Sequence, residues 1–117
     1  MKFKNENNVS FILDSLFFIA TTLSELKKFT IARSYYEELE TLARSLNYQK
    51  YLETTLFMEG FCAYKTEDYE LTIQNFTTLE KLEKEYVNKF QYYFLFGRIL
   101  RLTGQNEMSL KKFQFVY

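Results

Sequence analysis

The sequence contains no proline, no tryptophan and no histidine, and only three of its 117 residues are glycine. Sandwiches and barrels need a turn about every ten residues, built mainly from glycine and proline. The sequence therefore predicts an all-α fold. Hydrophobic residues make up 47% of the chain and aromatic residues 20%, which suffices for a packed core and exceeds what a disordered chain contains. The length predicts one domain, covering residues 1–117.

The missing histidine excludes Ser–His and Cys–His nucleophile pairs and histidine-ligated metal sites. The single cysteine, Cys62, excludes an intrachain disulfide and a multi-thiolate zinc site, and we expect it to be a small buried apolar residue. A lone cysteine also favours a reducing compartment, the cytoplasm. Acidic clusters such as Glu37-Glu38-Glu40 are expected to be solvated helix faces. The sequence therefore predicts that the protein is not an enzyme and that it binds no cofactor and no metal.

Fifteen basic and fifteen acidic residues give a formal net charge of zero, but the charge is uneven. Residues 51–85 carry eight acids against three lysines, and residues 86–117 carry five basic residues against one acid. An RNA-binding helical repeat would need a basic groove along its length. The acidic middle segment opposes phosphate contacts, so no nucleic-acid partner is expected.

An apolar stretch at residues 11–20 follows Lys2 and Lys4, as in a short signal peptide. Asp14 interrupts this stretch, and no Ala-x-Ala cleavage site follows it. The stretch is also too short and too polar to span a membrane. We expect a buried helix of the fold and no membrane partner.

The chain contains an internal repeat anchored on the small residues Ala20, Gly60 and Gly97, which are 40 and then 37 residues apart. Around each anchor lie a bulky apolar residue four positions before it, a small residue twelve positions after it and an aromatic residue sixteen positions after it. These are Leu16, Leu56 and Tyr93; Ala32, Thr72 and Ser109; and Tyr36, Phe76 and Phe113. Agreement of four columns over three windows predicts three units at about 10–47, 48–87 and 88–117.

Each unit is predicted to be a pair of antiparallel helices that approach closely at the small residues. The expected helices are 9–27, 30–46, 49–65, 68–86, 88–103 and 106–117, and the last pair is incomplete. Thr30 and Asp68 are predicted to cap the second and fourth helices, and Asn106 to begin the last one. Gly104 is predicted to end the fifth helix in a left-handed conformation.

The residues expected in the core come from the repeat columns and from apolar positions one helical turn away from them. They are Leu16, Ile19, Ala20, Leu23, Phe29, Ala32, Tyr36, Leu39, Leu56, Gly60, Tyr69, Ile73, Phe76, Leu79, Tyr93, Phe96, Gly97, Leu100, Leu110 and Phe113.

These columns resemble the tetratricopeptide repeat (TPR), whose pattern places a bulky residue, Leu, Gly and Tyr on one helix and Ala and Phe on the next. The chain departs from the pattern in its longer period, against roughly 34 residues in that family, and at Glu59, where leucine is usual. The resemblance implies a right-handed superhelix of antiparallel helix pairs. It also implies a scaffold or sensor module that binds a protein or peptide in a concave groove. The alternatives are a self-assembling structural module and an effector-sensing fragment of a larger bacterial regulator.

The resemblance also implies that the first helix of each pair lines the concave surface. The side chains expected there are Phe17, Thr21 and Ser24 in the first unit, Phe57, Phe61 and Tyr64 in the second, and Phe94, Arg98 and Arg101 in the third. An apolar strip beside two guanidinium groups suits a peptide with an apolar anchor and a carboxylate. The competing interpretation is that these aromatic residues pack between helices and the arginines pair with acids such as Glu59.

The last unit leaves Phe113, Phe115 and Val116 near an open end, where TPR arrays usually carry a solvating helix. The sequence therefore predicts either a homodimer through the C-terminal end or a chain that is a fragment of a longer protein.

Overall fold

A computed structural model describes residues 6–81 and 89–117, and all six of its regular elements are α-helices. They are α1 (Glu6–Glu25), α2 (Phe29–Ser45), α3 (Gln49–Lys65), α4 (Tyr69–Lys81), α5 (Lys89–Leu102) and α6 (Asn106–Val116). The all-α prediction is confirmed. Helix ends agree with the expected ranges to within three residues, except that the ends expected at 86 and 88 lie outside the described residues.

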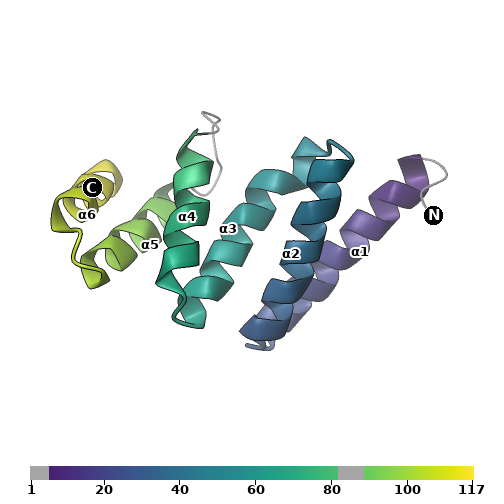
Figure 1. Cartoon of the computed structure of the whole chain (residues 1–117), viewed down its shortest axis with the longest axis horizontal. Coiled ribbons are helices and arrows are strands. Elements are labelled where there is room, and N and C mark those ends of the chain that lie inside the picture. Colours follow the sequence, from purple (N-terminus) through teal and green to yellow (C-terminus); the bar gives the residue numbers. More distant parts are fainter. Residues whose placement is uncertain (1–5, 82–88) are drawn as a thin grey trace.

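The helices form an elongated row in which each packs against the next along the chain (Figure 1). The first helices of the pairs, α1, α3 and α5, tilt in one direction, and α2 and α4 cross in front of them. The row measures 49 × 30 × 19 Å. This shape gives the molecule two ends as well as two broad sides.

The turns inside the three pairs have the same backbone conformation. Lys27, Glu67 and Gly104, each seven residues after an anchor, have positive φ angles of 63°, 64° and 83°. In each turn the N–H of this residue bonds to the carbonyl three residues earlier, and the next N–H bonds to the carbonyl five residues earlier. Asn47, between the first two pairs, repeats the motif with a φ of 57°. The prediction for Gly104 is confirmed.

The residue after each left-handed position precedes the second helix of the pair. Asp68 caps α4 as predicted, since its Oδ1 accepts the N–H of Leu71 at 3.3 Å. The prediction for Thr30 is wrong, because α2 begins at Phe29 and the preceding Lys28 makes no capping bond through its side chain. Asn106 begins α6, as expected.

The two helices of a pair cross at the small residues. In the second pair, the Thr72 hydroxyl donates to the carbonyl oxygen of Gly60 at 2.9 Å, and in the third pair Ser109 donates to Gly97 at 2.7 Å. In the first pair, Ala32 occupies this position and is fully buried. The predicted approach of the two helices is thus found in all three pairs.

The aromatic column fills the space beside each crossing. A Cβ atom on Gly60 would lie 2.8 Å from the Phe76 ring, and one on Gly97 would lie 3.0 Å from the Phe113 ring. Tyr36 and Phe76 are fully buried, whereas Phe113 is half-buried. Each glycine therefore leaves room for the aromatic ring, with a closer approach at Gly60 than at Gly97.

Most of the expected core is buried or half-buried, but two residues are not. Ile19 on α1 is 42% exposed and Leu110 on α6 is 57% exposed. Both lie on faces that no other described helix covers, at opposite ends of the row. Their placement in the core was wrong, because burial at these columns requires a neighbouring pair.

Candidate functional site

Three of the residues predicted to line the groove make contacts inside the helix packing. Phe57 is 5% exposed and stacks on Phe76, with ring centroids 5.8 Å apart. Phe17 packs edge-on against Tyr36 at 6.4 Å. The Thr21 hydroxyl hydrogen-bonds the Tyr36 hydroxyl at 3.0 Å, and burial raises the pKa of Tyr36 to about 12. For Phe57 the competing interpretation holds, since it has almost no exposed face.

Ser24, which was also expected to line the groove, is buried. It lies against Cys62 of the next pair, with 3.9 Å between Sγ and Oγ. Cys62 is fully buried, as predicted, and burial raises the pKa of its thiol. A buried thiol with a raised pKa is a poor nucleophile.

Phe61 and Tyr64 on α3 are half-buried. Phe61 packs edge-on against Phe29 at 6.1 Å, and Tyr64 packs against Tyr69 at 6.1 Å. The ammonium group of Lys65 lies 5.5 Å from the Phe61 ring centroid and 5.9 Å from that of Tyr64. Each of the two rings therefore packs against another aromatic ring of the fold and also lies close to the Lys65 ammonium group.

The residues predicted on α5 are exposed. The guanidinium carbon of Arg98 lies 5.7 Å from the Tyr64 ring centroid and 5.9 Å from that of Phe94, which is 46% exposed. Arg101, one turn further on, is exposed as well. Neither arginine forms an ion pair within the described part of the chain. We call Phe61, Tyr64, Lys65, Phe94 and Arg98 the Arg98 surface.

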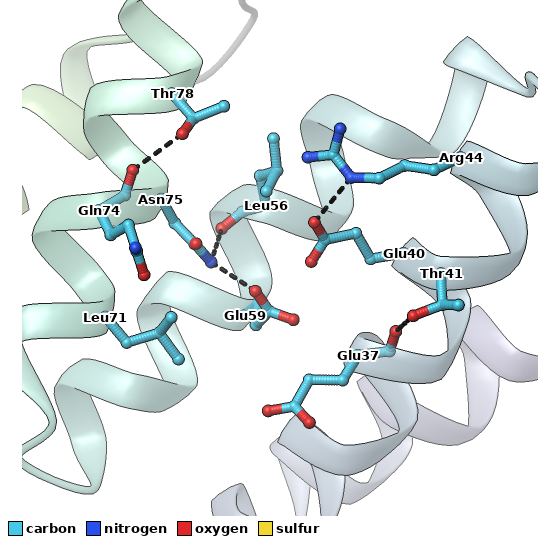
Figure 2. A pocket seen from close by; sticks show the side chains of 10 residues that line it. All are labelled: Glu37, Glu40, Thr41, Arg44, Leu56, Glu59, Leu71, Gln74, Asn75 and Thr78. Carbon is cyan, nitrogen blue, oxygen red and sulfur yellow. Dashed lines mark hydrogen bonds and ion pairs between the residues drawn. The ribbon is translucent and has the colours of Figure 1, made fainter.

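A concave site lies elsewhere, between α2 and α4 and over α3, and has a volume of about 510 Å³ (Figure 2). The sequence did not predict it. Its lining residues are mostly polar: Glu37, Glu40, Thr41, Arg44, Leu56, Glu59, Leu71, Gln74, Asn75 and Thr78. Three carboxylates against one arginine make this groove acidic.

Glu59 lies on the floor of the acidic groove and is only 3% exposed. Its Oε1 accepts a hydrogen bond of 2.6 Å from the side-chain amide of Asn75, which also donates to the Leu56 carbonyl at 3.3 Å. Its Oε2 is buried and has no hydrogen-bond partner among the described residues. A buried, half-satisfied carboxylate is costly to ionise.

The pKa of Glu59 reflects this environment. Burial raises it from 4.5 to about 7, against the opposing hydrogen bond from Asn75 and with a further rise from the charges of Glu40 and Glu37. Glu59 therefore changes its charge close to neutral pH. The available signal in the sequence was a glutamate at a repeat position where leucine is usual.

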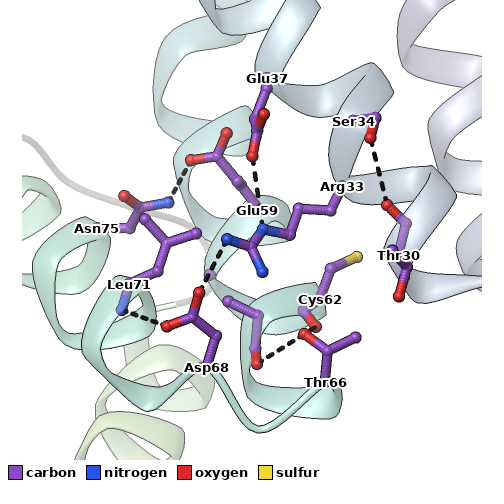
Figure 3. A network of polar contacts seen from close by, with 12 residues as sticks. Thr30, Arg33, Ser34, Glu37, Glu59, Cys62, Thr66, Asp68, Leu71 and Asn75 are labelled. Atoms are coloured by element: carbon purple, nitrogen blue, oxygen red, sulfur yellow. Dashed lines mark hydrogen bonds and ion pairs between the residues drawn. The ribbon is translucent and has the colours of Figure 1, made fainter.

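Ion pairs join successive units beside these sites (Figure 3). The Arg33 guanidinium on α2 lies 2.9 Å from Asp68 at the start of α4 and 3.5 Å from Glu37 on its own helix. Lys112 on α6 pairs with Glu80 on α4 in the same way. Each of these two ion pairs connects side chains of two neighbouring units.

The described residues contain no group of three or more Cys, Asp or Glu side chains placed to hold a metal ion. Within the same ranges, no helix is both long enough and apolar enough to cross a membrane. No family model, no curated protein and no solved structure matches this chain.

Proposed function

We propose that this chain is a TPR-like helical-repeat module that binds a protein or peptide partner, and not an enzyme. The observation that carries the proposal is the Arg98 surface: an exposed guanidinium held over two aromatic rings, with no acidic partner in the described part of the chain. An arginine placed on aromatic rings in this way keeps its hydrogen-bond donors available for a carboxylate.

The recurrence of the same features in successive helix pairs supports the proposal that the chain is a helical-repeat module. The same turn, the same crossing and the same aromatic position beside it recur at intervals of 40 and 37 residues. Such in-phase stacking is typical of solenoids, which present extended surfaces to their partners. A right-handed superhelix of TPR type is the arrangement that we propose.

The chemistry of the surface defines the ligand. Phe94 offers an exposed apolar ring, and Arg98 and Arg101 offer two guanidinium groups one turn apart on α5. A guanidinium binds a carboxylate through two parallel hydrogen bonds. We therefore infer a peptide segment with an apolar side chain next to an acidic side chain or a C-terminal carboxylate. Phe57 is left out of this ligand site because it has almost no exposed face, and Phe17 and Thr21 are left out because they contact Tyr36 within the first pair.

Selection from a displayed library of random peptides tests the proposal. We expect selected peptides to contain an apolar residue beside Asp, Glu or a free C-terminus. Their affinity should fall at least tenfold for Arg98→Ala, in a salt-sensitive way, and for Phe94→Ala. Lys111→Ala, an exposed cation on α6, is the matched control and should bind normally. Peptides that bind all three variants equally would contradict the proposal.

A further inference from the structure

At one end of the row, α1 and α2 carry apolar side chains that no other described helix covers. On α1, Phe11 is 69% exposed, Phe18 63% and Ile19 42%, and on α2 Ile31 is 51% exposed. Phe18, Ile19, Ile31 and Tyr35 border a shallow groove of about 480 Å³, and Phe11 lies two helical turns earlier on α1. We call these five residues the N-terminal face. Apolar patches of this kind mark interaction surfaces.

The internal repeat shows what such a face is built to receive. Forty residues after Phe11, Phe18 and Ile19 lie Tyr51, Met58 and Glu59 in the second unit. Tyr51 is 8% exposed and Glu59 3%, although both occupy the same positions in their helix pair. The N-terminal face is therefore the first unit's copy of a covered surface.

These positions of the second unit are covered mainly by α2, and Phe17 of α1 also packs on Tyr51, with ring centroids 5.8 Å apart. Tyr51 packs in one cluster with Leu39 and Ala43, and Met58 packs against a cluster that contains Ala32 and Tyr36. Glu59 shares the acidic groove with α2 side chains. The N-terminal face thus has the form of a site for the second helix of another pair.

The opposite end of the row offers such a helix. The second helix of the last pair is α6, on which Leu110 is 57% exposed, Phe113 is half-buried and Tyr117, just beyond its end, is fully exposed. By the repeat, Phe113 and Tyr117 correspond to Tyr36 and Glu40 of α2. We call Leu110, Phe113 and Tyr117 the outward face of α6. By the repeat, this face corresponds to the face of α2 that covers the second unit.

The two ends also match in chemistry. Inside the chain, Glu40 of α2 lies near Glu59, so both sides of that contact are acidic and line a polar groove. At the two ends the corresponding residues are Tyr117 and Ile19, and neither side chain is charged at neutral pH. A second contact repeats in the same way. Inside the chain, Tyr36 of α2 lies in the cluster against which Met58 packs, and at the two ends the corresponding residues are Phe113 and Phe18. An apolar helix face is thus available for an apolar site.

We propose that the outward face of α6 of one copy docks on the N-terminal face of a second copy, which continues the row of helix pairs head to tail. The contact repeats the packing of α2 on the second unit across two chains. Because the two contacting surfaces differ, each added copy leaves one of each surface open. Association is therefore expected to continue beyond a dimer as concentration rises.

Sedimentation velocity on the full chain and two variants tests this contact. Phe18→Asp places a charge on the N-terminal face, and Leu110→Asp places one on α6. Both sites are exposed, so both variants should keep the helical circular dichroism of the original chain. We expect the original chain to associate with rising concentration, each variant alone to be monomeric, and an equimolar mixture of the two to form a dimer through the remaining intact faces.

Lys111→Asp, next to Leu110 on α6 but in the column of the exposed Ser34, is the matched control and should associate like the original chain. An original chain that stays monomeric overturns the proposal. So does a Phe18→Asp variant that still dimerises alone, since this would indicate a symmetric contact between two α6 helices. Peptide binding at the Arg98 surface should be unchanged in Phe18→Asp, so the two proposals fail separately.

Discussion

The hydroxyl of Thr72 donates a hydrogen bond to the carbonyl oxygen of Gly60, twelve residues earlier, and Ser109 makes the same bond to Gly97. Each bond joins the second helix of a pair to the first at the small residues where the two helices pack. A helix carbonyl already accepts one bond from its own helix, and the hydroxyl supplies a second donor for its remaining lone pair. The register of the two helices in a pair is thereby fixed by polar geometry as well as by volume.

Replacing Thr72 by valine removes this hydroxyl and keeps the shape of the side chain. We expect the free energy of unfolding to fall by about 1–2 kcal/mol, because the hydrogen bond is buried. Urea denaturation measures the change. Thr78→Val is the matched control: its hydroxyl bonds within α4 at an exposed site, so its loss should cost less than about 0.5 kcal/mol. Equal losses in the two variants would contradict the role assigned to Thr72.

The two anchor glycines should respond differently to alanine. In Gly60→Ala the new Cβ would lie 2.8 Å from the ring of Phe76, which packs against Phe57 on one side and Phe96 on the other. We expect a net loss of about 1–2 kcal/mol in the free energy of unfolding, despite the better helix propensity of alanine.

In Gly97→Ala the neighbouring ring is Phe113, which is half-buried at the end of the row and has room to move. The steric cost and the gain in helix propensity should then nearly cancel. Thermal or urea unfolding of the two variants provides the comparison. A Gly97→Ala variant less stable than Gly60→Ala would show that the third crossing is the tighter one, against the structure.

Glu59 should make stability depend on pH. Its pKa is about 7 in the folded chain and near 4.5 when unfolded, so the folded chain binds more protons between these values. The contribution of Glu59 to stability is therefore fully present below about pH 4.5 and is lost as the pH rises towards 7. Glu59→Gln keeps an acceptor for Asn75 and removes the charge. Relative to the original chain, we expect it to gain about 2 kcal/mol more at pH 8 than at pH 5.

Urea denaturation of both proteins at the two pH values measures this difference. Glu38→Gln, an exposed glutamate on α2, is the control and should change stability by the same small amount at both pH values. A Glu59→Gln effect that is independent of pH would mean that the carboxylate is solvated in the folded chain.

Phe57 and Phe94 occupy the same position of the repeat, three residues before their anchors, and should differ in what they contribute. Phe57 is 5% exposed and Phe94 46%. We expect Phe57→Ala to lower the free energy of unfolding by about 3–4 kcal/mol, and Phe94→Ala by about 1 kcal/mol or less. Thermal melts followed by circular dichroism distinguish the two. Similar losses would contradict the different burial of the two rings.

This pair of phenylalanines also shows why the groove was only partly predictable. The repeat columns identify equivalent positions, but burial depends on what packs beside each unit. The second unit has a neighbour on both sides, whereas the first and third have one each. Ile19 and Leu110 were misplaced for the same reason. The repeat columns treat all three units alike, so they do not separate the burial of an end unit from that of the middle one.

The helices and the crossings were predictable because they depend on local spacing. The left-handed turn residues were predictable only at Gly104. Lys27, Asn47 and Glu67 adopt the same conformation without being glycine, because the two helices that they join are held by packing elsewhere. The acidic groove could not be predicted from local spacing, because its residues come from three helices. Glu37 and Glu40 lie on α2, Glu59 on α3 and Asn75 on α4.

The central claim is that successive helix pairs stack in one phase, and a cross-link between the first two pairs tests it most directly. Ser24 on α1 lies against the chain's single cysteine, Cys62 on α3, with 3.9 Å between Oγ and Sγ. In a Ser24→Cys variant we expect mild oxidation to join residues 24 and 62 within one chain, detected by mass spectrometry of the digested protein. Thr22→Cys, exposed two residues earlier on the same helix, should give no such link. Absence of the link in Ser24→Cys, or equal linking in both variants, would contradict the stacking.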